Sequence, residues 1–203
     1  YVIFTRRGID IDEYPAVKEY LSQWKDELEP KEKSTDPDPG RKPGDYKWFE
    51  LQDTIDYWRE FEKPKIIYGK FATGPRFALD NEQGVYFNDA SWMIRPVDKR
   101  LLGVLNSAMG WFLIKQKCTK IQSGYQLIWD QFKNIPVPEN LPSELEDRVE
   151  EIQTAKKEGE RDKVREISNA IDEVVFNAYD LSEQETDIVR NQTSDLDWVS
   201  SNG

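Results

Sequence analysis

The stretch Lys63-Pro64-Lys65-Ile66-Ile67-Tyr68 lies at the centre of the pattern that decides the fold. Its last four residues indicate a buried β-strand, since a short, largely apolar run follows a proline. Before it, the apolar residues of 51–61 indicate a helix that ends ahead of the proline. After it, residues 77–94 alternate aromatic and polar side chains around a turn at 80–84, which predicts an antiparallel hairpin or meander. The pattern predicts an α+β fold with a mixed or antiparallel sheet and packed helices.

The N-terminal residues predict a second group of elements. Residues 2–5 indicate a strand, and apolar residues at helical spacing over 15–29 indicate an amphipathic helix. Residues 30–45 hold four prolines and two glycines, so this segment is expected to be a long loop. A loop of this length is uncommon in a compact domain and is either functional or disordered.

The C-terminal half is predicted to be mainly helical. Asp98 opens a strong helical pattern, and residues 124–129 indicate one more strand. Ser143 and Glu146 have the spacing of a capping box at the start of another helix. Two helical patterns interrupted at residues 158–160 then predict a helical hairpin, which suits a lever or a dimerisation arm.

These elements divide the chain into three predicted parts. Residues 1–140 form the first domain, residues 141–190 the helical hairpin, and residues 191–203 a polar tail that is expected to be disordered. The chain opens on a strand-like pattern without a methionine, which indicates a piece of a longer protein. Part of the function is therefore expected to belong to other domains.

Composition excludes several function classes. The 203 residues include no histidine, so catalysis by Ser-His-Asp or Cys-His sets is excluded. The single cysteine, Cys118, excludes an intrachain disulfide and a zinc site built from Cys and His ligands. It fits a reducing cytoplasm. No apolar run approaches the roughly 18 residues that a membrane helix needs, and the charge order of the first residues predicts no signal peptide.

Charge is distributed unevenly along the chain. The total of 28 basic and 39 acidic residues gives a formal net charge of −11, which at first speaks against a nucleic-acid partner. Residues 41–140, however, carry 15 basic and 12 acidic side chains, whereas residues 141–203 carry 7 basic and 17 acidic ones. The acidity is thus mostly C-terminal, and the middle of the chain is expected to present a basic face.

The chain itself contains neither of two catalytic patterns in a usable form. Pro37-Asp38 followed by Asp45-Tyr46-Lys47 has the residue types of a metal-dependent nuclease site. Its six-residue spacer contains Gly40, Pro43 and Gly44 and is too short and broken for the required pair of strands, so a solvated loop is the better interpretation. The Asn/Asp-Pro-Pro-Tyr/Phe loop that grips a flipped adenine in methyltransferases does not occur. No catalytic set is therefore predicted.

Basic residues, aromatic residues and amides alternate along the middle of the chain. Their donors match phosphates and base edges, which favours nucleic-acid binding. The alternative interpretation is that the aromatic residues form the core and the charged ones only keep the surface soluble.

Several motifs, in order, resemble one known family. They are Trp48-Phe49-Glu50-Leu51-Gln52, the stretch from Phe61 to Tyr68, Leu101-Leu102-Gly103-Val104-Leu105-Asn106-Ser107, Ser123-Gly124-Tyr125, the stretch from Gln131 to Pro138, and the stretch from Ile171 to Glu185. Together they are similar to the TaqI-like C-terminal specificity domain of bacterial and archaeal restriction–modification proteins. The sequence departs from the family pattern at Gly69, where a proline is usual, and at residues 126–129, which replace a more basic stretch.

The resemblance implies a module that recognises a short sequence in double-stranded DNA. Such a module positions the duplex for an adenine methyltransferase, and often a nuclease, in N-terminal domains of the same polypeptide. It implies a cytoplasmic prokaryotic protein. S-adenosylmethionine and Mg²⁺ are then expected only in those catalytic domains, and neither a cofactor nor a membrane partner is expected for this chain.

The residues predicted to contact DNA combine basic, amide, hydroxyl and aromatic side chains of the middle segment. They are Arg41, Lys42, Lys47, Arg76, Lys120, Gln122, Ser123 and Tyr125. The alternative function is an acidic protein–protein interaction module that docks another subunit through its C-terminal helices, because acidic helices repel DNA.

Overall fold

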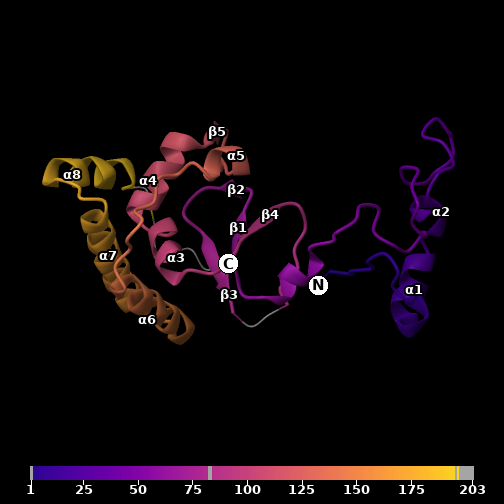
Figure 1. Cartoon of the computed structure of the whole chain (residues 1–203), viewed down its shortest axis with the longest axis horizontal. Helices are drawn as coiled ribbons and strands as arrows, with labels where there is room; N and C mark the ends of the chain where they lie inside the picture. The colour runs from indigo at the N-terminus through magenta and orange to yellow at the C-terminus, as the bar shows by residue number, and fades with distance from the viewer. Residues whose placement is uncertain (1, 82–83, 195, 197–203) are drawn as a thin grey trace. The chain divides into compact units, whose positions relative to one another are not determined.

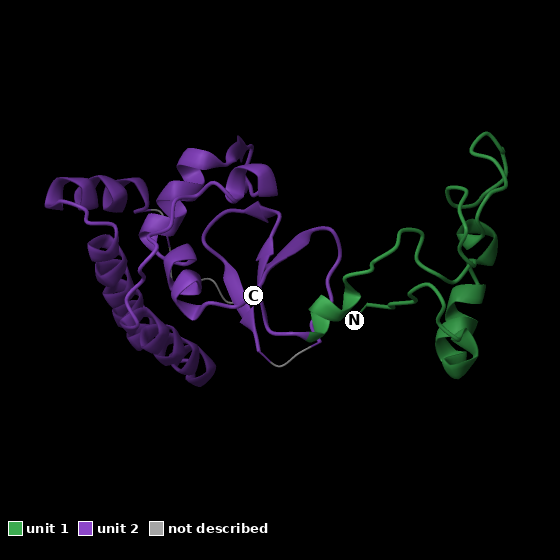
Figure 2. Cartoon of the chain, viewed as in Figure 1, with its two compact units in different colours: residues 1–62 green, residues 63–203 purple. Residues whose placement is uncertain are grey.

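The computed structural model describes residues 2–81, 84–194 and 196. The chain forms two compact units, residues 1–62 and residues 63–203, which we call unit 1 and unit 2 (Figure 2). The described residues contain helices and two small antiparallel sheets, so the predicted α+β class is confirmed. Among the described residues, no helix is long and apolar enough to cross a membrane.

Unit 1 consists of short helical segments and long loops. Its elements are the 3₁₀ helix η1 (Ile11–Glu13), the helices α1 (Pro15–Ser22) and α2 (Lys25–Leu28), and the 3₁₀ helix η2 (Trp58–Glu62). The single helix predicted over residues 15–29 is thus interrupted at Gln23 and Trp24. No residue of α1 is buried, so packing does not hold a longer helix together.

Two other predictions for unit 1 are wrong. Residues 2–5 form no strand, and residues 51–57 form no helix. The amide of Leu51 donates instead to the carbonyl oxygen of Thr5, 2.8 Å away. This long-range backbone hydrogen bond connects the two segments, which are otherwise irregular. The loop predicted over residues 30–45 is confirmed, with one isolated bridge between Pro30 and Arg41.

The first sheet of unit 2 has the strand order β3-β1-β4. It is built from β1 (Lys65–Gly69), β3 (Phe77–Asp80) and β4 (Ser91–Ile94). The strand predicted at residues 65–68 is confirmed, but the hairpin predicted over residues 77–94 is wrong, because β3 and β4 each pair with β1 and not with each other. The central strand is β1, and its Ile66 and Tyr68 side chains are buried in the core.

The single helix predicted to begin at Asp98 is divided in the structure into α3 (Lys99–Leu105) and α4 (Ala108–Lys117). The Asp98 carboxylate caps α3 by accepting from the amides of Arg100 and Leu101, as the sequence predicts. The Ser107 hydroxyl accepts from the amide of Gly110 and begins α4. This second cap divides the predicted helix, because a serine side chain competes with the continuing helical backbone.

The second sheet of unit 2 has the order β2-β6-β5, from β2 (Phe71–Ala72), β6 (Gly124–Gln126) and β5 (Thr119–Ile121). The strand predicted over residues 124–129 ends at Gln126, and α5 (Trp129–Phe132) follows it. Two backbone hydrogen bonds at Lys70 connect the sheets, since its amide donates to Ala90 and its carbonyl accepts from Leu127.

The predicted helical hairpin is confirmed as α6 (Glu144–Glu158) and α7 (Arg161–Ala178). A further helix, α8 (Glu183–Gln192), follows it (Figure 1). The capping box predicted at Ser143 is wrong, because that side chain makes no capping hydrogen bond. A capping box is present instead at Ser182 and Glu185, at the start of α8. Residues 195 and 197–203 of the predicted tail lie outside the described residues.

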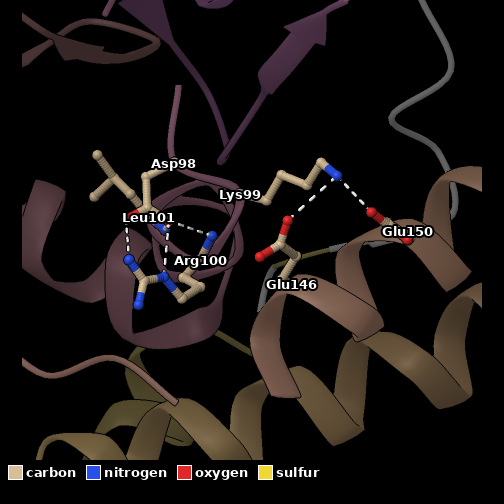
Figure 3. A network of polar contacts seen from close by, with 6 residues as sticks. All are labelled: Asp98, Lys99, Arg100, Leu101, Glu146 and Glu150. Carbon is tan, nitrogen blue, oxygen red and sulfur yellow. Dashed lines mark hydrogen bonds and ion pairs between the residues drawn. The ribbon is translucent and has the colours of Figure 1, made fainter. Parts of the chain in front are cut away.

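One apolar core runs through unit 2 and includes the hairpin. Leu145 and Val149 of α6 approach Gly103 of α3, and residues of α7 such as Val175 belong to the same buried cluster. At the surface, the Lys99 ammonium group bridges from α3 to the carboxylates of Glu146, 3.4 Å away, and Glu150 (Figure 3). The hydrogen bond to Glu150, above all, raises the pKa of Lys99.

Candidate nucleic-acid interface

A close approach between two strands shapes the second sheet of unit 2. A Cβ atom on Gly124 of β6 would lie 2.3 Å from the carbonyl oxygen of Ala72 in β2. Only glycine permits this approach, since real side chains do not tolerate such a contact with backbone. The Ser123-Gly124 turn is thereby held beside β2 and the segment that follows it.

A cavity of about 250 Å³ lies between these segments. Its buried lining includes Tyr68 and Phe77 of the first sheet and Leu127 after β6. Its exposed lining includes the side chains of Phe71, Thr73, Arg76 and Ser123. The cavity is therefore apolar on its buried side, and polar groups surround it where it meets solvent.

The buried Tyr68 side chain has an unusual environment. Its ring packs against Phe77 and Phe132, with centroids 5.4 and 4.8 Å apart. Its hydroxyl is buried and has no hydrogen-bond partner among the described residues. Burial raises the pKa of Tyr68 to about 12, so the phenol stays protonated at physiological pH. This unsatisfied hydroxyl belongs to a residue that lines the cavity.

The segments around the cavity carry positive charge without acidic neighbours in sequence. Residues 69–79 and 115–129 contain no Asp or Glu. They contain five basic residues, namely Lys70, Arg76, Lys115, Lys117 and Lys120. These two segments thus hold five of the fifteen basic residues of 41–140 and none of its twelve acidic ones, which suits a polyanionic ligand. The basic face itself stays a prediction.

Five of the predicted DNA-contacting residues belong to unit 2. Arg76 and Ser123 line the same cavity, and Lys120 and Gln122 are exposed on β5 and on the turn that follows it. Tyr125 is half-buried on β6, and its ring meets that of Trp111 edge to face with centroids 5.5 Å apart. Packing thus accounts for the position of Tyr125, and a DNA contact through it stays a prediction, as do the contacts of the other four.

The other three predicted residues belong to unit 1. The Arg41 guanidinium donates to the carbonyl oxygens of Leu28, Trp48 and Glu50 at 2.7–2.9 Å and lies over the Tyr46 ring. Its donors therefore hold the long loop together. Lys42 and Lys47 are exposed, and their roles as phosphate contacts stay predictions.

Sequence reasoning missed the structural role of Glu50 in unit 1. Its carboxylate accepts from the amides of Gly8, 2.8 Å away, and Lys47, 2.9 Å away. Burial raises the pKa of Glu50, but these hydrogen bonds and the charges of Lys47 and Arg7 outweigh burial, so the pKa is lowered. The only sequence signal at Glu50 is its place in the family motif from Trp48 to Gln52.

Phe71 and Thr73 were also missed at the cavity. The signal that points to them is the long acid-free stretch 69–79, in which an aromatic residue stands between Lys70 and Arg76. Phe71 keeps 57% of its surface exposed, so part of its ring is accessible beside the cavity.

The described residues contain no group of three or more His, Cys, Asp or Glu side chains that could hold a metal ion. Unit 2 combines a cavity, two acid-free basic segments and a helical hairpin that shares the apolar core. Comparison with protein families agrees with this description. The model of the TaqI-like C-terminal specificity domain matches residues 4–137, well over half of the chain, and confirms the resemblance seen in the sequence motifs. The chain belongs to the family of TaqI-like C-terminal specificity domains, which are DNA target-specificity modules of restriction–modification enzymes.

Proposed function

We propose that this chain recognises a short sequence in duplex DNA and positions the duplex for catalytic domains located elsewhere in its parent protein. The observation that carries the proposal is the pair of acid-free segments, 69–79 and 115–129, around the second sheet. Lys115 donates to the carbonyl oxygen of Gln192 on α8, 2.7 Å away. The other four basic side chains, without acidic neighbours in sequence, suit a phosphate backbone, because phosphate contacts supply most of the affinity and orient the protein on the duplex.

The distribution of acidic residues supports one orientation of unit 2. Residues 141–203, which include α6 to α8, carry 17 acidic and 7 basic side chains. DNA is repelled by such a surface, so the duplex is expected on the side of the second sheet. The hairpin then faces away from DNA and is available to hold geometry between domains.

The chemistry is assigned to the parent protein. An adenine methyltransferase, with a nuclease in some parents, would use S-adenosylmethionine and Mg²⁺ in its own domains. This chain would contribute sequence selection and alignment of the target base. A cytoplasmic prokaryotic location suits that role, since such systems act on DNA inside the cell.

Binding of labelled duplexes at several salt concentrations tests the proposal. A pool of random duplexes should bind the chain at low salt and weaken as salt rises. Arg76→Ala and Lys120→Ala should each lower the slope of log affinity against log salt by about one unit, because each removes one phosphate contact. Arg165→Ala on α7, whose side chain is 59% exposed, is the control and should leave the slope unchanged.

Absence of binding at every salt concentration, with the catalytic domains attached, would contradict the proposal. Co-purification of another subunit without DNA affinity would favour the alternative function, an acidic module that docks a protein through its C-terminal helices. That alternative stays a prediction.

A further inference from the structure

We infer that the cavity beside the second sheet holds a single nucleobase that has turned out of the DNA stack. The inference rests on the proposed DNA-binding function and specifies which part of the DNA the cavity binds. Its starting point is the juxtaposition in unit 2 of an apolar cavity and an exposed aromatic side chain, within segments that carry basic and no acidic residues.

The size of the cavity suits one ring system. Pockets for drug-sized molecules occupy roughly 300–1,000 Å³, and this cavity, at about 250 Å³, is smaller. Tyr68, Phe77 and Leu127 provide apolar surface for the faces of a planar ring. A phosphate would gain nothing from these apolar side chains, whereas the faces of a base would.

The concave shape distinguishes this ligand from a base pair inside an intact duplex. Base edges in B-DNA lie at the bottom of grooves, so a protein reads them with a helix, a ribbon or a side chain that projects into the groove. A concave surface encloses only a group that projects from the DNA. A base turned outward is such a group, and enclosure by a pocket is the way proteins hold it.

The exposed lining residues match the chemistry of a nucleobase. Phe71 exposes 57% of its surface beside the cavity and offers a ring on which a base stacks. The side chains of Thr73 and Ser123 are exposed and line the cavity, and they provide hydroxyl groups for the polar edge of the base. Lys120 on β5 and Arg76 supply positive charge for the flanking phosphates.

Three duplexes with identical flanks test the inference with the full chain. One is fully paired, one carries a single bulged thymine, and one carries an abasic residue at the bulge. The bulged base has already left the stack, so its binding does not include the cost of unstacking. The chain should bind the bulged-base duplex about tenfold more tightly than the abasic one, because only the former fills the cavity.

Two variants and a matched control locate the effect. Phe71→Ala should abolish the difference between the bulged-base and abasic duplexes, and Ser123→Phe, which fills the opening of the cavity, should do the same. Ile188→Ala removes an apolar side chain of similar exposure, 50%, from α8 and should preserve the difference. Circular dichroism of each variant checks that the fold is retained.

A photocrosslink supplies an independent location. With 5-iodouracil as the bulged base, irradiation and mass spectrometry should place the adduct within residues 68–77 or 121–127. An adduct only outside these segments would overturn the inference. Equal affinities for the bulged-base and abasic duplexes would also overturn it, while binding of the paired duplex would leave the proposed function standing. If no duplex binds, both proposals fail.

Discussion

Lys65 and Asp80 form an ion pair in the interior of unit 2. The Lys65 side chain is 0% exposed and that of Asp80 is 6% exposed, and the Asp80 carboxylate also accepts from the amide of Val85, 3.3 Å away. The pair joins the start of β1 to the end of β3, where Lys65 and Asp80 are register partners. It therefore links the central strand to the loop that follows β3.

Removing one member of this pair is expected to destabilise unit 2 strongly. Lys65→Met or Asp80→Leu removes one member of a buried ion pair, which costs about 3–5 kcal/mol. The double variant should recover part of that loss, because it removes both charges. Urea unfolding followed by circular dichroism measures the free energies.

Lys163→Met is the matched control for this prediction. Its partner Glu160 and Lys163 itself are half exposed, so the loss should stay below about 1 kcal/mol. A Lys65→Met protein as stable as this control would refute a structural role for the buried pair.

Asp172 on α7 gives the protein a specific dependence on pH. Its carboxylate accepts from the amide of Ala108 at 2.7 Å, and burial raises its pKa to about 7, which the hydrogen bond offsets only in part. The unfolded value is near 3.8, so the folded state binds the proton more tightly between about pH 4 and pH 7. The stability contributed by this group therefore falls as pH rises through that interval.

Asp172→Asn should remove this dependence. The amide oxygen still accepts from Ala108, but no buried charge forms at high pH. The melting temperature of the variant, relative to the parent chain, should rise from pH 4 to pH 8 and then level off. Asp162→Asn, an exposed position on the same helix, should show no such trend. Parallel pH profiles for the parent chain and Asp172→Asn would contradict the assignment.

At the scale of elements, the contact between α3 and α4 depends on a small residue. A Cβ atom on Gly110 of α4 would lie 2.2 Å from the carbonyl oxygen of Val104 and 2.9 Å from that of Leu105. Because backbone atoms form this contact, no side-chain rotation relieves it.

Gly110→Ala should therefore cost about 1–3 kcal/mol or more, although alanine is the better helix former. Gly103→Ala on α3 is the control, since its Cβ atom would meet only side chains, the nearest being Val149 Cγ2 at 3.3 Å. Thermal unfolding of the two variants compares the effects. A Gly110→Ala variant as stable as Gly103→Ala would show that the helices separate easily.

At the scale of the whole molecule, unit 2 has its own core, which joins the first sheet, α3, α4 and the hairpin. A chain limited to residues 63–203 should therefore unfold cooperatively in urea, with native helical content beforehand. A non-cooperative transition would show that residues 63–203 do not fold stably without residues 1–62.

The division into residues 1–140 and 141–190 stays a prediction, and the same measurement on residues 1–140 tests it. Without α6 and α7, this shorter chain lacks Leu145, Val149 and Val175 of the shared core. Cooperative unfolding of residues 1–140 would support the predicted division.

The pairing of strands shows why part of the fold escaped sequence reasoning. Residues 65–68 are recognisable as a strand because the run is short and apolar, and the hairpin helices are recognisable because their apolar residues repeat at helical spacing. The order β3-β1-β4 depends on contacts between distant residues, which a local pattern does not contain. The same holds for the second sheet, whose strands are two or three residues long.

The sequence by itself determined the family motifs, the concentration of acidic residues in the last third, the acid-free stretches of the middle and the absence of histidine chemistry. These are properties of the order and kind of residues, so they need no coordinates. Tertiary structure decided that Arg76 and Ser123 line one cavity, that Arg41 is engaged with backbone carbonyls, and that Phe71 stands exposed beside a base-sized space. Such facts follow from long-range packing, in which segments some 50 residues apart, 71–76 and 121–127, become neighbours.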